Sequence, residues 1–586
     1  MKRHLSWSLF AAGLLLAASL LAGYQWRSLQ ADAPHNPDLG LPAGEFVARV
    51  YYDQISDIDL LQAYDLHEYN NLVEKYVLVG LNRYGYEQLL SEGWRLAVDA
   101  EATAALMPDF DLFTYYGGYR NVDELYADVA TIVSSYPDIA EIVVYGESYC
   151  LLTGGCVTLG GQLQPGYELK ALRITNRAIA DPDKPVFFLM AALHSREIAT
   201  PEIAMRLADW LVGGYGVNAD ATWMVDYHEL WIVPVANPDG LWLVELGTKP
   251  PYNGNPFTQR KNANRANGCT TWPPTGSSQY GIDLNRNHSF AWGGAGTSTI
   301  PCNLTYRGPS AASEVEVYQI ENLVRAIIPD QRGPGINDPA PPDTRGIFIS
   351  LHSYSNLILW PWGHVNSPAP NYLGLKAIGD KMATYNGYVS CQPPACLYAA
   401  SGTSDDWAYG ELGVPAYTFE IGTLAQGGFF PPYARIDDTF WPGNGPALQY
   451  AAKIARTPYM TVWGPDALNV TAVNNGSNQV TINATINDTA NGNQPIAAAE
   501  YALNYPFWIT DTITGSLTAV DGSFNSPIEP VTAMVDVSQL PPGQNILFVR
   551  GLDSGGNWGP VTAAFFAVLT PTAVDPYRLL IPLILR

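Results

Sequence analysis

The chain has 586 residues, of which 47% are apolar and 15% are charged, and its formal net charge at pH 7 is −24. At roughly 150 residues per domain this length suggests about two to four domains, and the apolar fraction excludes a largely disordered chain. The excess of acidic residues opposes contact with phosphate backbones, so we expect no nucleic-acid partner.

Residues 1–33 resemble a secretory signal peptide. Lys2 and Arg3 give a positive start, an apolar run follows over 9–21, and Ala31-Asp32-Ala33 offers a cleavage site. An uncleaved N-terminal anchor is the alternative. Beyond the leader no apolar run is long enough to span a bilayer, so the mature form is expected to have no membrane span and to be secreted.

The six cysteines are spaced as local pairs, which favours an oxidising compartment. No pair has the C-x2-C spacing that is common in zinc sites, although zinc ligation is the alternative. We predict the disulfides Cys150–Cys156, Cys269–Cys302 and Cys391–Cys396.

Residues 34–110 are predicted to form a small α+β unit. Apolar stretches at 46–52 and 76–81 alternate like strands, and segments at 57–64 and 86–92 look helical. Its place after a signal peptide suggests an inhibitory or folding-assisting pro-segment, and an ordinary N-terminal domain is the alternative.

Residues 111–458 are predicted to form one α/β domain, with a mixed, mostly parallel sheet flanked by helices. The expected strands and helices alternate along the chain. The strands are 142–145, 172–175, 186–193, 228–235, 346–351 and 416–420, and the helices include 122–136, 201–212, 311–327 and 372–386.

The composition shifts towards Asn, Thr, Val and Gly after this domain. Short strands separated by turns predict an immunoglobulin-like β-sandwich over 465–570. Residues 571–586 form an apolar C-terminal tail, too short to span a bilayer and without an assigned role.

Polar residues follow four of the predicted strands. They are His194 to Glu197, Asn237 with Asp239, His352 and Glu420. In an open α/β sheet, ligands bind outside the carboxyl ends of the strands, so we expect these side chains to share one edge.

Two imidazoles and a carboxylate make a catalytic zinc site when a fourth position stays open. His194 and Glu197, three residues apart in a turn, and His352 at another strand end fit this set. Glu420 would be the base beside the ion, with an arginine-paired structural role as the alternative. We expect ordinary core or surface roles for the other histidines, His4, His35, His67, His228, His288 and His364.

A series of motifs over about 115–455 resembles the zinc metallocarboxypeptidases of the A/B and T type. The series is His194-Ser-Arg-Glu197, Asn237-Pro-Asp-Gly240, Arg260-Lys-Asn262, Asp283-Leu-Asn-Arg-Asn287, Leu351-His-Ser-Tyr354, Tyr398-Ala-Ala-Ser-Gly402, Asp406-Trp-Ala-Tyr409 and Tyr417-Thr-Phe-Glu420. The resemblance implies the metallocarboxypeptidase fold and hydrolysis by metal-activated water, without a covalent intermediate.

The same resemblance implies a role for each matching residue. One Zn²⁺ per chain would be held by His194, Glu197 and His352, with Glu420 as general base. Arg260 would polarise the scissile carbonyl, although the nearby Arg265 is a competitor. The substrate's terminal carboxylate would be held by Asn285, Arg286 and Tyr398, with Arg196 as a further substrate-binding arginine.

The specificity pocket predicted from this resemblance contains an acidic residue. Asp405 stands seven residues after Tyr398, where an acidic residue in the family favours Lys or Arg at the substrate C-terminus. Similarity to the T branch also implies acceptance of apolar ends. The other expected lining residues are Leu359, Gly363, Ala400, Thr403 and Thr418.

We therefore expect an exported, monomeric zinc carboxypeptidase, made as a zymogen, that acts on peptide or protein C-termini. Its β-sandwich is expected to contact the cell surface. The alternatives are a cell-wall γ-D-glutamyl-diamino acid peptidase of the same fold and a catalytically dead surface-binding protein. Retention of Asn285, Arg286 and Tyr398 favours a substrate with an α-carboxylate.

Overall fold

The computed structural model describes residues 39–42, 44–105, 115–181, 183–252, 254–266 and 268–569. The chain divides into two compact units, Met1–Gly44 and Glu45–Arg586, and the fold described below is that of the second. The predicted leader (1–33) and C-terminal tail (571–586) lie outside the described residues. Within those residues, no helix is both long and apolar enough to cross a membrane.

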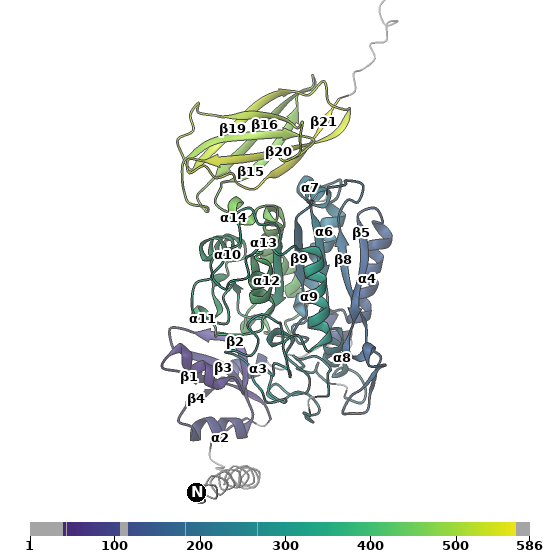
Figure 1. Cartoon of the computed structure of the whole chain (residues 1–586), viewed down its shortest axis with the longest axis vertical. Coiled ribbons are helices and arrows are strands. Elements are labelled where there is room, and N and C mark those ends of the chain that lie inside the picture. Colours follow the sequence, from purple (N-terminus) through teal and green to yellow (C-terminus); the bar gives the residue numbers. More distant parts are fainter. Residues whose placement is uncertain are drawn as a thin grey trace, which may run out of the picture. The chain divides into compact units, whose positions relative to one another are not determined.

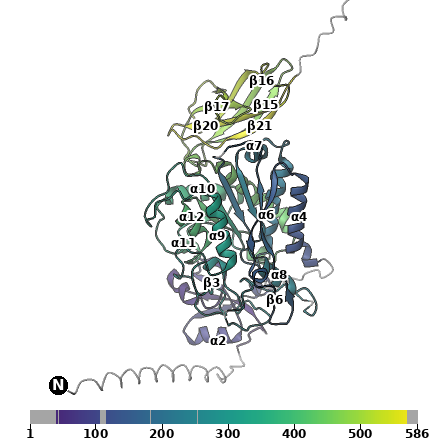
Figure 2. The same ribbon diagram turned by 45° about the vertical axis from the view of Figure 1, so that its right-hand side comes forward.

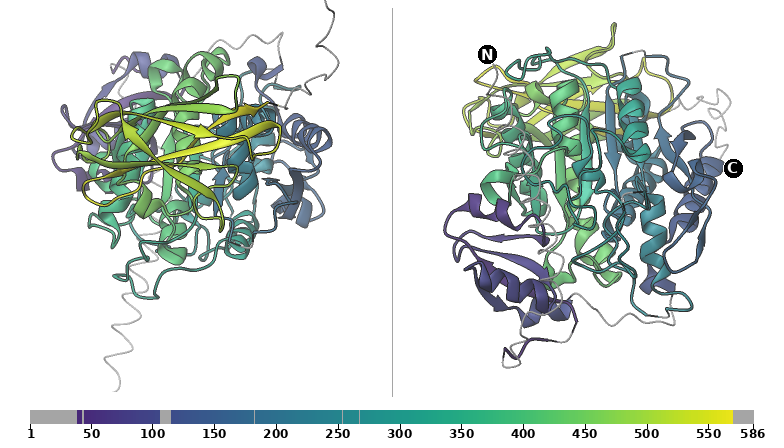
Figure 3. Two further views of the ribbon diagram at one scale, coloured as in Figure 1. Left: turned by 90° about the horizontal axis from the view of Figure 1, so that it is seen from above. Right: turned by 60° about the horizontal axis from the view of Figure 1, so that its bottom comes forward.

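An antiparallel sheet, called the N-terminal sheet, follows Glu45 and is purple in Figure 3. Its strand order is β2-β3-β1-β4, and apolar residues such as Val47 and Leu78 form its core. Asn82 caps helix α2 by accepting a hydrogen bond from the backbone N–H of Gly85, at 2.9 Å. The elements are β1 (Phe46–Tyr51), η1 (Ile55–Leu61), β2 (Asp65–Asn71), β3 (Tyr76–Leu81), α2 (Arg83–Ser91), β4 (Arg95–Val98) and α3 (Ala100–Ala105).

The central sheet confirms the predicted α/β fold. Its strand order is β13-β12-β14-β11-β9-β10-β8-β5. Its inner strands β9, β10, β11 and β14 pair in parallel, while β5, β8 and β12 add antiparallel pairs. The strands are β5 (Ala140–Glu147), β8 (Glu168–Ile174), β9 (Val186–Met190), β10 (Glu229–Val233), β11 (Ile347–His352), β12 (Leu357–Leu359), β13 (Val389–Cys391) and β14 (Ala416–Glu420).

Helices cover the central sheet, and Figures 1 and 2 show several of them running alongside its strands. α4 and α9 contact β5, α6 contacts β8, β10 and β11, and α12 contacts β11 and β14. The central strands β9 and β11 are buried on both faces, as expected for a helix-covered parallel sheet. The main helices are α4 (Val122–Ser135), α6 (Ala199–Gly214), α7 (Ala219–Tyr227), α8 (Pro238–Leu246), α9 (Val315–Ile327), α10 (Tyr372–Asn386), α12 (Ser404–Leu412) and α13 (Trp441–Ile454).

Shorter elements connect these layers. They are η2 (Tyr115–Gly118), α5 (Tyr149–Leu152), β6 (Cys156–Val157), β7 (Leu163–Gln164), η3 (Leu284–Arg286), α11 (Pro393–Cys396), η4 (Leu424–Gln426), η5 (Ile436–Phe440) and α14 (Pro458–Thr461).

The region predicted as an immunoglobulin-like β-sandwich folds as an antiparallel sheet, called the C-terminal sheet, and its strand order is β15-β16-β19-β18-β17-β20-β21 (lime to yellow in Figure 3). Hydrogen bonding through β18 joins its two halves into one sheet, and β15 contacts β21, so the sheet is nearly closed. Such closure leaves little exposed strand edge. The strands are β15 (Asp466–Asn474), β16 (Gln479–Asn487), β17 (Ile496–Leu503), β18 (Ile513–Ala519), β19 (Ile528–Asp536), β20 (Gly543–Asp553) and β21 (Thr562–Val568).

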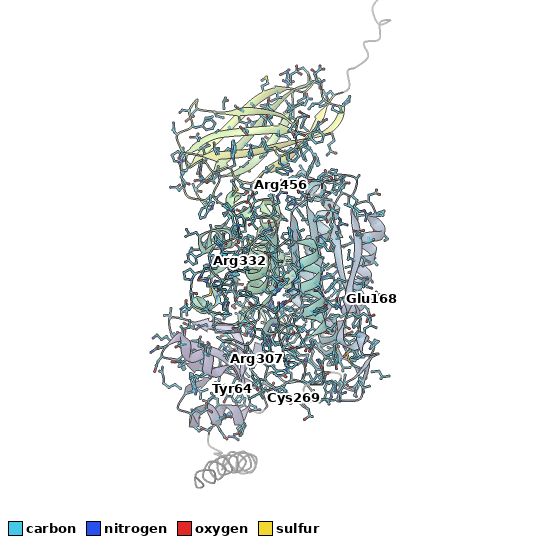
Figure 4. The ribbon with its side chains drawn as sticks, viewed as in Figure 1. Tyr64, Glu168, Cys269, Arg307, Arg332 and Arg456 are labelled. Atoms are coloured by element: carbon cyan, nitrogen blue, oxygen red, sulfur yellow. A yellow bond between two sulfur atoms is a disulfide. The ribbon has the colours of Figure 1, made fainter. Side chains whose placement is uncertain are left out.

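All the predicted disulfides are present: Cys150–Cys156, Cys269–Cys302 and Cys391–Cys396. Cys269, labelled in Figure 4, is bridged to Cys302 and closes the loop that carries Asp283. The bridge therefore restrains the loop that leads to the candidate site.

Candidate metal and substrate site

Neighbouring strands of the central sheet end together at the candidate site. β9 and β14 lie on either side of β11 and run parallel to it. His352 is the last residue of β11 and is paired in register with Glu420, the last residue of β14. His194 follows the end of β9. The topology thus brings the predicted ligands and the predicted base to one edge.

His194, Glu197 and His352 converge on a single point. One ligand atom from each side chain lies within 4.8 Å of the others. His194 Nδ1 is 2.8 Å from Glu197 Oε1, and His352 Nδ1 is 3.0 Å from Glu197 Oε2. The side chains are almost completely buried.

This cluster fits a zinc ion. The Nδ1 atoms of His194 and His352 face each other at 3.0 Å, so their lone pairs repel when both neutral rings carry their proton on Nε2. A cation beside them and the carboxylate removes that repulsion, and two nitrogens with one oxygen are a ligand set typical of catalytic zinc. The opposite nitrogens are held from outside: His194 Nε2 lies 3.1 Å from Asp283 Oδ1 and His352 Nε2 lies 2.9 Å from Ser350 Oγ. Such contacts orient metal ligands.

The electrostatics of the cluster favour a charged carboxylate. Burial alone would raise the pKa of Glu197, but His194 and His352 outweigh it and lower that pKa. Burial lowers the pKa of His352, which keeps its ring neutral and able to donate a lone pair.

Glu420 lies beside this cluster with one oxygen free. Its side chain is buried, and its Oε2 has no hydrogen-bond partner among the described residues. Burial raises the pKa of Glu420, and the nearby carboxylates of Glu68 and Glu197 raise it further. Within the described residues no arginine forms an ion pair with Glu420, which disfavours the arginine-paired alternative.

Arg260 is held in the site by an ion pair. Its Nε donates to Asp283 Oδ2 at 3.1 Å, so Asp283 joins Arg260 to His194. Arg265 instead donates to the backbone carbonyl of Val157. The structure therefore brings Arg260, and not Arg265, to the cluster.

Asn285, Arg286 and Tyr398 line the same pocket as His194, Arg260 and Glu420. Asn285 Oδ1 accepts a hydrogen bond from Ser404 N at 2.9 Å, and Arg286 Nε donates to Gly296 O at 2.7 Å. These bonds fix an amide and a guanidinium that can bind a carboxylate.

The pocket also contains the predicted acidic residue. Asp405 lines it together with Leu359, Ala400, Thr403 and Thr418. Gly363 is not among the lining residues, and its N–H donates to Asp406 Oδ1 at 2.8 Å. Burial, then the nearby Asp406, raises the pKa of Asp405 to about 7.

A residue that sequence reasoning missed fills the pocket. Glu68, in β2 of the N-terminal sheet, lies with Oε1 3.0 Å from Arg260 Nη1, and Tyr398 OH donates to its Oε2. With Glu68 in place the remaining cavity is only about 40 Å³. The polar sequence of β2 gives no strand or ligand signal, so its role depends on contacts with distant parts of the chain.

Arg196 lies outside this pocket and is engaged by the same strand. Its Nη2 donates to Asp65 Oδ1 at 3.1 Å, and its guanidinium stacks on Phe429, 3.9 Å from the ring centroid. Next to it, His67 Nδ1 lies 2.8 Å from the hydroxyl of Tyr354. β2 therefore covers Arg196 as well as the pocket.

Asn237 lies at the expected sheet edge, where it contacts Leu193 and Ser195, but neither Asn237 nor Asp239 lines the pocket. Asn237 Nδ2 donates to Ser195 Oγ at 2.9 Å and so supports the turn that carries His194. Asp239 faces away and accepts from Ser148 Oγ at 2.8 Å and from Cys150 N at 2.7 Å.

Comparison with known proteins places this site in a family. Residues 125–441 match the family model described as zinc carboxypeptidase. The chain is 28% identical over 336 residues to carboxypeptidase B of Helicoverpa zea, covering 55% of this chain and 67% of that protein. It is 27% identical over 328 residues to carboxypeptidase A2 of Mus musculus, covering 55% of this chain and 66% of that protein. The chain thus spans about two thirds of the length of these relatives.

A solved structure supports the fold. The carboxypeptidase A from Helicoverpa armigera is 23% identical and superposes with a TM-score of 0.50, covering 70% of this chain and 99% of that one.

Proposed function

Because this chain belongs to the zinc carboxypeptidase family, we propose that it is the precursor of an exported enzyme that hydrolyses the C-terminal peptide bond of peptides. The main support is a pocket lined by polar side chains that include one of the metal-binding group. These are His194, Arg260, Asn285, Arg286, Tyr398 and Glu420, and Glu197 and His352 lie next to His194 as the other possible metal ligands.

His194, Glu197 and His352 would hold zinc, which when bound supplies Lewis acidity that polarises a carbonyl and lowers the pKa of water. Asn285, Arg286 and Tyr398 bind the terminal carboxylate of the substrate and so place its last peptide bond in the pocket. Arg260 donates to the oxygen of that bond as negative charge develops.

Glu420 moves the proton in this proposal. Its unpartnered Oε2 accepts a proton from the attacking water and then delivers it to the leaving amine. Asp283 acts through other residues, because it orients both His194 and Arg260.

The described form is the inhibited precursor in this proposal. The carboxylate of Glu68 is bonded to Arg260 and Tyr398, which are proposed to bind the substrate. Asp65 accepts a hydrogen bond from Arg196 in the same way. Substrate can enter only after β2 leaves, so residues 34–110 act as an inhibitory pro-segment that must be released.

We propose that the pocket accepts both basic and apolar C-terminal residues. Asp405 offers a carboxylate to a substrate ammonium or guanidinium, while Leu359, Ala400 and Thr418 offer contacts to an uncharged side chain. Export is supported by the disulfides. Cell-surface contact through the C-terminal sheet and a monomeric state are further parts of this proposal.

The test is release of C-terminal residues by the activated, zinc-loaded enzyme. Hippuryl-Arg and hippuryl-Phe should both be cleaved, the activity should disappear with 1,10-phenanthroline, and added Zn²⁺ should restore it. Turnover of purified muropeptides alone would overturn the proposal in favour of a cell-wall peptidase, and no turnover of any substrate would favour a binding protein.

A further inference from the structure

A cluster of oxygen atoms in the C-terminal sheet lacks hydrogen-bond donors. It lies in the loop between β16 and β17 and has no part in the proposed peptidase reaction. Asp488 Oδ1, Asn491 Oδ1 and Gln494 Oε1 are buried atoms with no partner among the described residues. Asp488 is 0% exposed and Asn491 is 8% exposed. Buried oxygens normally accept hydrogen bonds or bind an ion, so these atoms are available to a ligand.

The backbone of the loop folds around Asp488. The N–H groups of Asn491 and Asn493 donate to the carbonyl of Asp488 at 3.0 and 2.8 Å. Gln494 N donates to Asp488 Oδ2 at 2.6 Å. This bond satisfies one carboxylate oxygen and leaves Oδ1 unpartnered, while Asn491 uses its Nδ2 on Gly464 O and leaves its own carbonyl oxygen unpartnered.

A second buried carboxylate adjoins the loop. Asp553 ends β20 and is paired in register with Ile496, and Ser554 N donates to Pro495 O at 2.8 Å. Asp553 accepts only neutral donors, Asn557 N and Nδ2, at 2.8 and 2.9 Å. Asp488 and Asp553 are both buried, and each acts on the other as a neighbouring negative charge.

The surrounding charges make the ionised form of Asp488 unfavourable unless a cation lies beside it. Burial, followed by Asp553 and Asp466, raises the pKa of Asp488 to about 6, against the opposing effects of Gln494 N and Lys381. Lys381 is itself bonded to Asp466, so the lysine that acts on Asp488 is already paired.

We propose that this loop, with Asp488, Asn491, Gln494 and Asp553, binds one Ca²⁺ ion. Carboxylate and amide oxygens without nitrogen or sulfur ligands suit a hard cation, and Ca²⁺ accepts the irregular geometry of a loop better than Mg²⁺. The bound ion joins the β16–β17 loop to the end of β20. Through Asn491 it also fixes Gly464, which precedes the C-terminal sheet.

Calorimetric titration of the zinc-loaded full chain tests this proposal with CaCl2 and, separately, MgCl2. We expect one Ca²⁺ per chain with a Kd below about 1 mM, as in extracellular modules, and clearly weaker Mg²⁺ binding. Bound Ca²⁺ should also raise the unfolding temperature of the C-terminal sheet. No heat with Ca²⁺, or equal affinity for both ions, would overturn the proposal.

Variants assign the ion to this loop. Asp488→Asn removes one charge and should weaken Ca²⁺ binding at least about tenfold, since charge count tunes such sites. The matched control is Asp536→Asn. Asp536 is exposed at the end of β19, whereas the loop adjoins the start of β19 through the pair Asn487–Ile528, so this substitution should leave the Ca²⁺ affinity unchanged. If Asp488→Asn does not fold, the Ca²⁺ affinity of Gln494→Ala is measured instead. Wild-type affinity in Gln494→Ala would contradict the assignment of the ion to this loop. Each readout is ion binding, so it is independent of peptidase activity.

Discussion

The carboxylate of Glu420 is buried beside two other carboxylates, and its Oε2 makes no hydrogen bond within the described residues. A buried acceptor in this state is unfavourable unless the free oxygen has a function. Glu420→Gln keeps the size of the side chain but cannot take up a proton. We expect kcat of the activated enzyme to fall by about 10²- to 10⁴-fold, the usual contribution of a general base.

The zinc content per chain of Glu420→Gln should equal that of the wild type, as measured by elemental mass spectrometry. Glu168→Gln is the matched control, because Glu168 (labelled in Figure 4) is exposed at the start of β8. Full activity in Glu420→Gln would contradict the role of Glu420 as the base.

If Asp405 binds basic substrate side chains as proposed, the substrate preference should depend on pH. Its pKa is raised to about 7 by burial and by Asp406, so below this pH the group is mostly neutral and above it mostly charged. The ratio of kcat/KM for hippuryl-Arg to that for hippuryl-Phe should therefore rise as the pH increases from 6 to 8. Taking the ratio cancels any titration that both substrates share. Asp405→Asn should give a low, flat ratio, and a flat ratio in the wild-type enzyme would contradict this role.

At the scale of elements, the sequence predicted the helices and strands whose ranges follow from the local spacing of apolar residues. Strand β14 (Ala416–Glu420) and helix α10 (Tyr372–Asn386) agree with their predicted ranges, because alternating or helical apolar spacing reports burial directly. The grouping of His194, Glu197 and His352 was predictable because strand ends of a parallel sheet meet at one edge.

β2 was not predicted, and the reason is physical. Its sequence, Asp-Leu-His-Glu-Tyr-Asn-Asn, lacks the apolar alternation of a strand, since Asp65, His67 and Glu68 are buried against Arg196, Tyr354 and Arg260. Their partners stand more than a hundred residues away in the chain. A pairing at that separation leaves no signal in the local sequence.

Glu68 gives this element a testable function. In the uncleaved precursor, Glu68→Ala removes the carboxylate that contacts Arg260 and Tyr398, so substrate should compete more easily for the pocket. We expect basal hydrolysis of hippuryl-Phe by the precursor to rise at least about tenfold, in keeping with the loss of a buried charged contact worth roughly 1.5–3 kcal/mol. Glu74→Ala, an exposed position after β2, is the control and should stay at the basal rate. Equal rates for the two variants would show that Glu68 does not contribute to inhibition.

At the scale of the whole molecule, net charge acts on substrates before they reach the pocket. The first 110 residues hold 7 basic and 14 acidic residues, so removing them changes the net charge from −24 to −17. The activated enzyme therefore remains strongly acidic and should attract cationic peptides over long range. Salt screens such attraction, because the Debye length falls from about 30 Å at 0.01 M to about 8 Å at 0.15 M ionic strength.

This long-range effect can be separated from the local effect of Asp405. A lysine-rich peptide and an uncharged peptide that both end in Phe present the same residue to the pocket. We expect kcat/KM for the lysine-rich peptide to fall severalfold over this range of salt, whereas that for the uncharged peptide should change little. Asp405→Asn should leave the salt dependence intact, because the attraction depends on the summed charge of the surface. Loss of the salt effect in that variant would instead place the attraction in the pocket.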